Sequence, residues 1–423
     1  MRKLQVYIEI EGMQTYVGSI SGSSPNDAQF AYSDQYIAAG HPPISISLPI
    51  SGEPFSAETT KNFFEGLLPE GFARKCVANW IHTSEDDYLT ILSVLGSECL
   101  GALRVSDNIH DSGDYKPLSI ESVKALAKEG VSKSTELITE AHLSLTGASG
   151  KVGLYYDPER NMWYQPQGDA PSTHIVKQSH VRLSDIVTNE QLSLTAASKL
   201  GISIPESFII NTGAARDDEI LFATKRYDRV IPKNAAYING LIRPFRLHQE
   251  DFAQALGIPA YEKYENGNKQ YLLKAFHLLR NNVADPLTDQ LKLWDMLIYD
   301  YLIGNTDNHI KNLSLLYSEN LKTVSLAPAY DIISTVIYQG TSREMAIGIG
   351  GERNIDHITR EHFINAASDV GLGKKMALKH FDVLVDGFEK ALNETAVRLN
   401  EEGYSKAKDI KEQILKHGGY SHL

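Results

Sequence analysis

The stretch Asp307-Asn308-His309-Ile310-Lys311-Asn312, together with the later Asp331-Ile332-Ile333, decides how this sequence folds. An aspartate, four residues, an asparagine and a second aspartate further on form the layout of a protein-kinase catalytic loop with its metal-binding acid. Apolar runs at 294–303 and 313–317 flank the first motif, which places it on a short loop between two buried elements. Asp and Asn also populate turns for conformational reasons, but the second acid beside another apolar segment favours a catalytic role.

These residue types suit phosphoryl transfer. One carboxylate accepts the proton of the attacking hydroxyl, and a carboxylate with an amide oxygen holds the Mg²⁺ that bridges the phosphates. Asp307 and Asn312 would stand at opposite ends of one loop and face the same pocket.

The composition is that of an ordinary globular protein. The 423 residues are 42% hydrophobic and 22% charged, enough for two or three domains. No apolar run reaches the ~18 residues of a membrane span, and the N-terminal stretch has no signal-peptide pattern. Two cysteines, Cys76 and Cys99, make neither a disulfide framework nor a zinc set, so we expect a cytoplasmic protein without membrane contact.

Charge argues against a broad nucleic-acid surface, because the net charge is −12. One dense basic stretch, Lys-Arg-Tyr-Asp-Arg at 225–229, leaves a local basic patch as an alternative.

The order of elements predicts an α+β fold of the bilobal protein-kinase-like kind, with a β-rich lobe before a mostly helical one and a small N-terminal α+β subdomain. We expect domains at 1–106, 107–248 and 249–423. The subdomain begins with a strand pair that turns at Glu11-Gly12, and a short strand follows at 43–49. The polar stretch 107–116 is expected to be a linker. Periodic segments at 185–200, 287–303 and 374–399 predict helices.

A loop of small residues, Ser144-Leu145-Thr146-Gly147-Ala148-Ser149-Gly150-Lys151, stands where a phosphate-binding loop is expected between two strands. Small residues let backbone N–H groups approach phosphate oxygens, and the lysine adds charge. It is not a Walker A motif, because Leu145 and Val152 occupy positions that require Gly and Ser or Thr. The alternative is an ordinary glycine hairpin.

Lys177 ends a predicted strand at 173–176, which could point it inward toward the phosphates. The alternative is a strand-end lysine that reaches solvent. Within the Asp307 loop, Lys311 could neutralise the transferred phosphoryl group, whereas His309 lacks the partner spacing of a metal ligand. No G-x-S-x-G elbow supports a serine hydrolase.

Taken together, these motifs resemble the HipA family of toxin serine/threonine kinases over almost the whole chain. In the N-terminal part the resemblance lies in ISISLP at 44–49, NFFEGLLP at 62–69 and GSECLGA at 96–102. Further on it lies in the loop ending at Lys151, THIVK at 173–177, RLHQEDF at 246–252, DNHIKN at 307–312 and YDIIS at 330–334. So many matches in the same order make the resemblance specific.

The resemblance implies that Asp307 is the catalytic base and that Asn312 and Asp331 hold Mg²⁺. Lys177 would contact the phosphates of ATP, and residues 249–252 would form the hinge around its adenine and ribose. The ATP-binding set implied in this way is Gly147, Ala148, Ser149, Gly150, Lys151, Lys177, Gln249, Glu250, Asp251, Phe252, His309 and Lys311.

The loop departs from the family's usual Gly-Ala-Gln-Glu-Lys, because this chain has Gly147-Ala148-Ser149-Gly150-Lys151. Family members inactivate themselves by autophosphorylation in this loop. The resemblance implies that the acceptor is Ser144, and the extra hydroxyl makes Ser149 a second candidate.

The resemblance also implies partners: an antitoxin of the helix-turn-helix type, a protein substrate in translation that is commonly an aminoacyl-tRNA synthetase, and DNA only through the antitoxin. One alternative is a kinase-fold binding protein that acts mainly in an antitoxin–DNA repressor complex, although every catalytic position is chemically competent. A kinase of small molecules or lipids is the other alternative, since its site chemistry would be the same.

Overall fold

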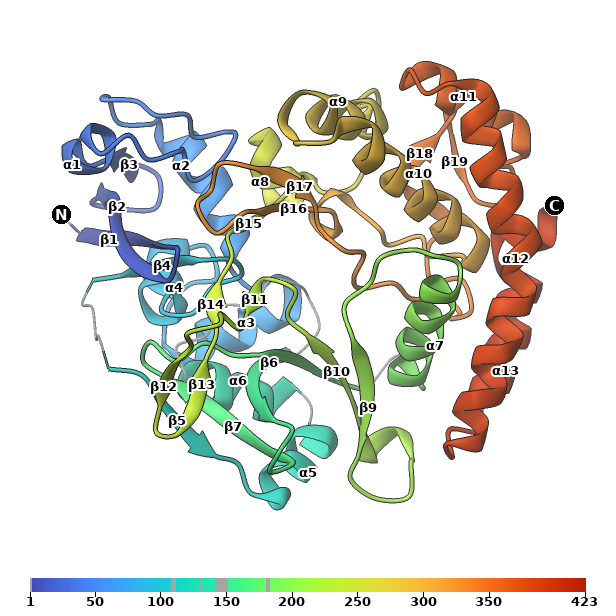
Figure 1. The fold of residues 1–423 in the computed structure, drawn as a ribbon, viewed down its shortest axis with the longest axis horizontal. Coiled ribbons are helices and arrows are strands. Elements are labelled where there is room, and N and C mark those ends of the chain that lie inside the picture. Colours follow the sequence, from blue (N-terminus) through green and yellow to red (C-terminus); the bar gives the residue numbers. More distant parts are fainter. Residues whose placement is uncertain (1, 108–111, 130, 141–150, 180–182) are drawn as a thin grey trace. The chain divides into compact units, whose positions relative to one another are not determined.

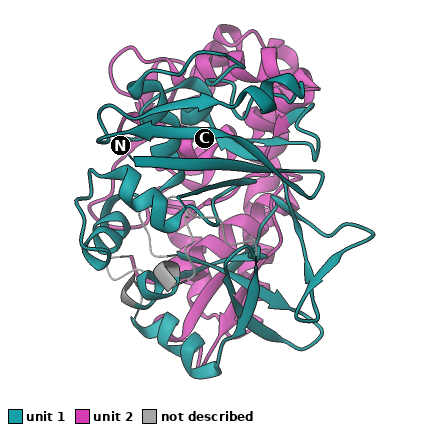
Figure 2. Cartoon of the chain, turned by 90° about the vertical axis from the view of Figure 1, so that its left-hand side faces the viewer, with its two compact units in different colours: residues 1–178, 223–260, 315–324 teal, residues 179–222, 261–314, 325–423 magenta. Residues whose placement is uncertain are grey.

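The computed structural model describes residues 2–107, 112–129, 131–140, 151–179 and 183–423. The chain forms two compact units, which Figure 2 colours separately. Unit 1 comprises Met1–Gln178, Ala223–Ala260 and Leu315–Val324, and unit 2 comprises Ser179–Phe222, Tyr261–Ser314 and Ser325–Leu423.

Unit 1 begins with a four-stranded antiparallel sheet in the order β3-β2-β1-β4 (Figure 1). Its strands are β1 (Arg2–Ile10), β2 (Met13–Gly22), β3 (Gln29–Tyr32) and β4 (Leu103–Ser106). The predicted turn joins β1 and β2, with φ of 50° at Glu11 and 78° at Gly12, as a type I′ hairpin requires. Leu4, Val6 and Ile8 are buried on one face because side chains alternate across a strand.

The strand predicted at 43–49 is wrong, because only an isolated bridge joins Ser45 and Leu48. Polar groups of this segment bond to a buried carboxylate instead of a neighbouring strand. Glu250 Oε2 accepts a hydrogen bond from the Ser45 hydroxyl at 2.5 Å, and its Oε1 accepts one from the Ile46 N–H at 3.1 Å. The helices of this part are α1 (Asp34–Ala38), α2 (Ala57–Phe64), η1 (Glu65–Leu67), α3 (Gly71–Trp80) and α4 (Tyr88–Leu95).

A second antiparallel sheet of unit 1 has the strand order β5-β7-β6-β8, and the end of β10 follows β8. The strands are β5 (Asp114–Pro117), β6 (Lys151–Asp157), β7 (Met162–Gln167), β8 (His174–Gln178) and β10 (Ile220–Lys225). Tyr115, Tyr155, Tyr164, Ala170 and Leu241 form its core cluster. Two helices that we did not predict, α5 (Ile120–Glu129) and α6 (Val131–Glu140), precede β6. The expected linker lies partly outside the described residues, and its end belongs to β5.

Short strand pairs and one helix complete unit 1. The pairs are β11 with β14, β12 with β13, and β15 with β16, which also pairs with β17. Their bounds are β11 (Arg229–Val230), β12 (Ala236–Ile238), β13 (Leu241–Arg243), β14 (Phe245–Arg246), β15 (Gln249–Asp251), β16 (Ser314–Tyr317), β17 (Val324–Leu326) and α8 (Phe252–Leu256).

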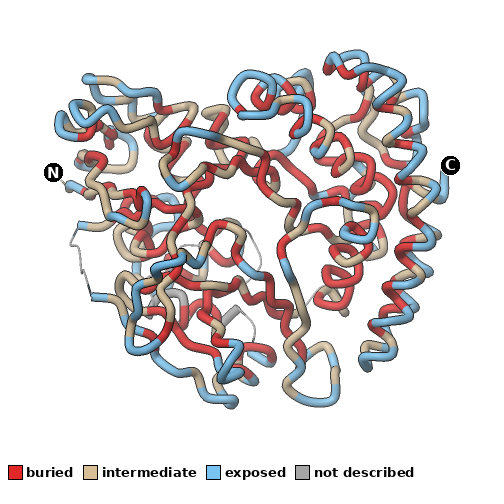
Figure 3. Tube along the Cα trace, viewed as in Figure 1, coloured by how far each residue is buried: buried red, intermediate tan, exposed pale blue. Residues whose placement is uncertain are grey.

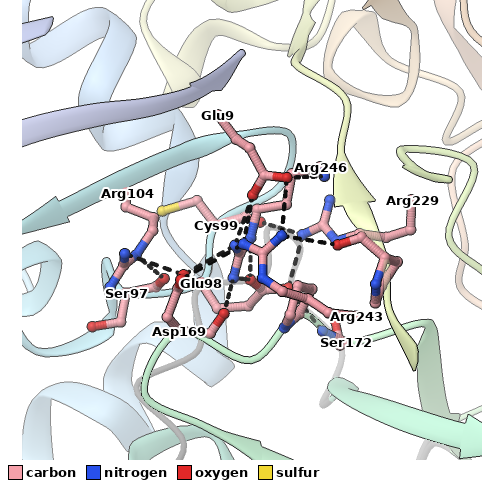
Figure 4. Close-up of polar contacts among 12 residues, drawn as sticks. Glu9, Ser97, Glu98, Cys99, Arg104, Asp169, Ser172, Arg229, Arg243 and Arg246 are labelled. Atoms are coloured by element: carbon pink, nitrogen blue, oxygen red, sulfur yellow. Dashed lines mark hydrogen bonds and ion pairs between the residues drawn. The ribbon is translucent and has the colours of Figure 1, made fainter. Parts of the chain in front are cut away.

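A buried ionic network joins β11, β13 and β14 to the first sheet (Figure 4). Glu98 is at its centre: its Oε1 lies 2.8 Å from Arg229 Nη2 and 3.2 Å from Arg226 Nη1, and its Oε2 lies 2.7 Å from Arg246 Nη2. Burial alone would raise the pKa of Glu98, but the surrounding guanidinium groups outweigh it and hold that pKa well below its ordinary value. The charged members are Glu9, Glu98, Asp169, Asp228, Arg104, Arg226, Arg229, Arg243 and Arg246.

This network corrects one interpretation of the sequence. The stretch at 225–229 is not a basic surface, because the side chains of Arg226 and Arg229 are 0% and 2% exposed and are paired with acids. Asp228, between them, binds Arg226 Nη2 at 2.7 Å and Arg229 Nη1 at 3.0 Å.

Unit 2 is mostly helical. Its helices are α7 (Ile186–Lys199), η2 (Asp217–Glu219), η3 (Ala260–Glu262), α9 (Tyr271–Asn282), α10 (Pro286–Ile303), η4 (Ile310–Asn312), α11 (Arg360–Asp369), α12 (Lys374–Glu401), α13 (Lys406–His417) and η5 (Gly419–His422). Its strands are β9 (Ser207–Asn211), β18 (Glu344–Ile349) and β19 (Glu352–Asn354).

The long helix α12 organises unit 2 and packs against α7, α10, α11 and α13. Buried and exposed residues alternate along it (Figure 3), and the buried side includes Ala377, Phe381, Leu384 and Phe388, the spacing of an amphipathic helix. In α10, the Trp294 indole N–H donates to the Ala377 carbonyl at 3.1 Å, which fixes α10 on α12. Among the described residues, no helix combines the length and apolar character needed to cross a bilayer.

Candidate active site

In unit 2, helix α10 leads directly into the loop that contains the sequence DNHIKN at 307–312. Asp285 caps its start by accepting a hydrogen bond from the Thr288 N–H at 3.2 Å, and Gly304 ends it with a φ of 74°. A Cβ at Gly304 would lie 2.2 Å from Val336 Cγ2. Glycine is therefore needed both for the left-handed backbone and for close packing.

Asp300, in the last turn of α10, fastens the loop. Its Oδ1 accepts a hydrogen bond from Asn305 Nδ2 at 2.8 Å, and its Oδ2 accepts one from the Asn308 amide. Asn305 Oδ1 in turn accepts from the backbone N–H of Asp307 at 3.2 Å. Burial raises the pKa of Asp300 to about 7, and the two amide donors oppose that rise. One carboxylate thus holds the chain on both sides of Asp307.

Asp307 is exposed, whereas its neighbours from 301 to 306 and from 308 to 311 are buried. Its Oδ1 accepts a hydrogen bond from the Tyr264 hydroxyl at 2.6 Å. Its carbonyl accepts from the His309 N–H at 2.8 Å and from Asn312 Nδ2 at 3.2 Å. The loop therefore presents one carboxylate at the surface on a backbone that is tied down.

Asn312 has its amide nitrogen engaged by the Asp307 carbonyl, which leaves its Oδ1 as the atom to face a cation. Tyr330, directly before Asp331, brings the second motif to this place. Its hydroxyl donates to the Lys311 carbonyl at 3.1 Å and lies 2.7 Å from Ser314 Oγ. These contacts stand on both sides of Asn312, so the structure brings the Asp331 segment to the Asp307 loop.

The residues after Asp331 are anchored to the end of α10. The Thr335 N–H donates to the Gly304 carbonyl at 2.9 Å, and Ser334 exchanges two hydrogen bonds with the side chain of Asn189 on α7, at 3.1 and 2.9 Å. Asp331 itself has a φ of 58°, a conformation that Asp tolerates better than most residues.

The donors on these segments fit Mg²⁺. Asp331 supplies a carboxylate and Asn312 an amide oxygen, both hard oxygen ligands of the kind that Mg²⁺ takes together with substrate phosphates.

His309 and Lys311 are both buried. The His309 ring meets the Tyr264 ring edge to face, with centroids 5.1 Å apart. The structure thus places His309 against the side chain that contacts the expected base.

In unit 1, Lys151 and Lys177 are direct partners across the antiparallel pair β6–β8. Opposite residues project from the same face of a sheet, so the two lysines extend side by side, an arrangement that like charges disfavour. A polyphosphate over this face would be attracted to both. Ser144, Gly147, Ala148, Ser149 and Gly150 lie outside the described residues.

The segment expected to form the nucleotide hinge has its side chains engaged within unit 1. Gln249 Nε2 donates to Asp228 Oδ2 at 3.3 Å, Asp251 caps α8, and Phe252 is fully buried. Glu250 accepts hydrogen bonds from Ser45, Ile46 and Tyr317, and burial, opposed by these donors, raises its pKa to about 7. Because these side chains are engaged, the hinge prediction now concerns only the backbone N–H and carbonyl groups of residues 249–252.

Sequence reasoning missed Tyr264 and Asp300, and it gave no role to Tyr330, although Tyr330 stands in the stretch YDIIS. Asp300 had a signal, since it is an acid inside an apolar helical run, where a charge needs a partner. Tyr264 had none, because its contact with Asp307 joins residues 43 positions apart.

The chain has a kinase-like α+β fold. Its strands carry the paired lysines, and its helical part carries Asp307, Asn312 and the Asp331 segment. Two family models match the chain: the HipA N-terminal domain at residues 8–106 and the HipA-like C-terminal domain at residues 143–392. The chain belongs to the HipA family, as its motifs predicted.

Curated relatives and a solved structure are also similar to this chain. Two proteins of Sinorhizobium fredii whose names describe them as presumptive kinases are similar to this chain. Y4mE is 31% identical over 89% of this chain and 88% of its own length, and Y4dM is 26% identical over 82% of each. A chain from the Shewanella oneidensis HipA, HipB and operator DNA complex matches with a TM-score of 0.79 at 20% identity, over 99% of this chain and 97% of that one. This similarity confirms the predicted fold class.

Proposed function

We propose that this chain is a serine/threonine protein kinase that transfers the γ-phosphate of ATP to a protein hydroxyl. The observation that carries the proposal is the exposed Asp307 carboxylate, held on a fixed loop beside Asn312 and the Asp331 segment. Kinase names among the relatives support it.

In the proposed reaction, the acceptor hydroxyl oxygen bonds to the γ-phosphorus while the Asp307 carboxylate takes its proton. The bond between the γ-phosphorus and the oxygen that bridges to the β-phosphate breaks, and ADP leaves with that oxygen. Asn312 and Asp331 would hold Mg²⁺, which when bound neutralises charge on the phosphates. Lys151 and Lys177 would attract phosphate oxygens of ATP to their shared face of the β6–β8 pair.

We also propose that the kinase is a toxin that modifies itself and a protein of translation, an aminoacyl-tRNA synthetase. Phosphate on Ser144, Ser149 or both would add roughly −1.5 to −2 charges where the phosphates of ATP must bind. It would compete for Lys151 and Lys177 and so switch the enzyme off. A helix-turn-helix antitoxin in the cytoplasm would hold the chain and supply the DNA contacts. The Shewanella protein was solved with HipB and operator DNA, which supports this partner class.

Intact-mass spectrometry after incubation with Mg-ATP tests the proposal. The wild-type chain should gain the mass of phosphate, and peptide mapping should place it within residues 144–151. Asp307→Ala should lose the reaction by several orders of magnitude, because the base and the positioned loop act together. Asp386→Ala, which removes an exposed aspartate from α12, is the matched control and should react like the wild type.

Phosphate incorporation by Asp307→Ala at a near-wild-type rate would show that the catalytic assignment is wrong. A wild-type chain that binds its partner but transfers no phosphate would favour the kinase-fold binding protein.

A further inference from the structure

We infer that Tyr264 is a positioning residue for the catalytic base, an inference that rests on the proposed role of Asp307. The Tyr264 hydroxyl donates a hydrogen bond to Asp307 Oδ1 at 2.6 Å. A distance this short is typical of a hydroxyl that donates to an ionised carboxylate.

The segment that carries Tyr264 is fixed on both sides. Before it, the Lys263 carbonyl accepts a hydrogen bond from the Ile310 N–H, inside the catalytic loop, at 3.4 Å. After it, Glu265 is bound at three points: its N–H donates to the Ala346 carbonyl at 2.9 Å, its Oε1 accepts from the Tyr271 N–H at 2.9 Å, and its Oε2 accepts from the Gly348 N–H at 2.6 Å. The Tyr264 backbone therefore has little freedom to move away from the loop.

The ring of Tyr264 is also placed by its neighbours. It meets the His309 ring at an interplanar angle of 84°, and the Lys263 ammonium lies 5.4 Å from its centroid. An edge-to-face ring pair and a cation near a ring are each modestly stabilising. The backbone and the ring of Tyr264 are thus both held in place, and its hydroxyl is positioned next to Asp307 Oδ1.

The contact matters because Asp307 is exposed, and an unrestrained aspartate rotates broadly about its terminal torsion. When Tyr264 engages Oδ1, the rotation of the carboxylate is restricted, and the plane in which it meets the proton of an incoming hydroxyl is set. Tyr264 is itself 41% exposed, so Tyr264 and Asp307 are both accessible from solvent. The opposite role, in which Tyr264 blocks the base until an acceptor displaces it, predicts the reverse effect on rate.

Tyr264→Phe tests the inference, because it removes the hydroxyl and keeps the ring that packs on His309. At saturating Mg-ATP, phosphate incorporation should slow roughly ten- to a hundredfold, the effect of one hydrogen bond to a charged group. The Kd for Mg-ATP and the thermal unfolding midpoint should stay at their wild-type values, because Tyr264 acts on the base alone. Tyr261→Phe makes the same chemical change at a tyrosine that is 79% exposed and should leave the rate unchanged.

A Tyr264→Phe rate equal to or above that of the wild type would overturn the inference while Asp307→Ala still confirmed the base. Weaker Mg-ATP binding with an unchanged saturated rate would overturn it too, by assigning Tyr264 to the nucleotide. If the wild type transferred no phosphate, the proposed function would fail first and the inference with it.

Discussion

At the residue scale, the most consequential group outside the reacting atoms is the buried carboxylate of Asp300. Its pKa of about 7 lies well above the ordinary 3.8 because burial disfavours the charge. Protonated Asp300 therefore contributes stability that is fully present below about pH 4 and is lost as pH rises through about 7. A shift of this size corresponds to a loss on the order of 4 kcal/mol.

We predict that Asp300→Asn flattens this pH dependence, because an amide cannot ionise. Urea unfolding of the variant should show a smaller loss of stability between about pH 5 and 8 than that of the wild type. Kinase turnover should nevertheless fall, because an amide at 300 has one acceptor oxygen for the two donors of Asn305 and Asn308.

The control for this experiment is Asp386→Asn, which changes an exposed acid. It should keep the wild-type pH profile. An Asp300→Asn profile as steep as that of the wild type would show that another group governs the dependence.

What the sequence reveals about single residues depends on how local their contacts are. Spacing alone predicts that Asp307 and Asn312 share one loop, and the hydrogen bond from Asn312 Nδ2 to the Asp307 carbonyl agrees with that placement. Tyr264 depends on a contact that only the folded chain makes. Arg226 and Arg229 were counted as possible surface charge, although the acid between them, Asp228, was a sign of internal pairing.

At the element scale, the first hairpin turn and the long periodic helices were predicted, whereas α5, α6 and the structure of residues 43–49 were not. The Glu11-Gly12 turn was predicted, and Asn239-Gly240 is the same kind of turn, with φ of 50° and 79°; its Asn-Gly signal was overlooked. The predicted strand at 43–49 failed because its polar groups bind Glu250, which is distant in sequence. Helix α12 matched its prediction because one periodic face packs along its whole length.

The ionic network around Glu98 supplies the prediction at this scale. It joins the loop before β4 to the strands β11 and β14 through Arg229 and Arg246, with carboxylate–guanidinium distances of 2.8 and 2.7 Å. Removing one member leaves buried charges without compensation, which typically costs about 3–5 kcal/mol. We expect Glu98→Ala to lower the free energy of unfolding by that amount in denaturant titrations.

Glu53→Ala, at an exposed glutamate in a loop of the same unit, is the matched control and should change stability by less than about 0.5 kcal/mol. If Glu98→Ala cost no more than this control, the network would not stabilise unit 1.

At the scale of the whole molecule, neither compact unit is a single continuous stretch of the sequence. Unit 1 takes in Ala223–Ala260 and Leu315–Val324 from within the sequence of unit 2. A linear pattern of strands and helices does not indicate such returns, because they are fixed by strand pairing between distant segments. The boundaries expected at 106 and 248 stay a prediction.

The remaining prediction concerns the chain in a cell, where kinase and binding-protein roles differ. Expression without an antitoxin should slow growth by halting translation, and co-expression of the cognate antitoxin should restore it. Asp331→Asn should abolish the effect, because it removes the charge of a proposed Mg²⁺ ligand. Asparagine also tolerates the left-handed backbone at this position, where φ is 58°, so the variant should fold and accumulate like the wild type.

Growth rate and protein level are measured together, with Asp369→Ala, an exposed aspartate at the end of α11, as the matched control that should stay toxic. If Asp331→Asn accumulated normally and still arrested growth as strongly as the wild type, toxicity would not depend on phosphoryl transfer. The chain would then act by binding. Binding would survive in Asp331→Asn, because the hydrogen bonds of Gly304, Ser334 and Thr335 hold this segment in place without the Asp331 carboxylate.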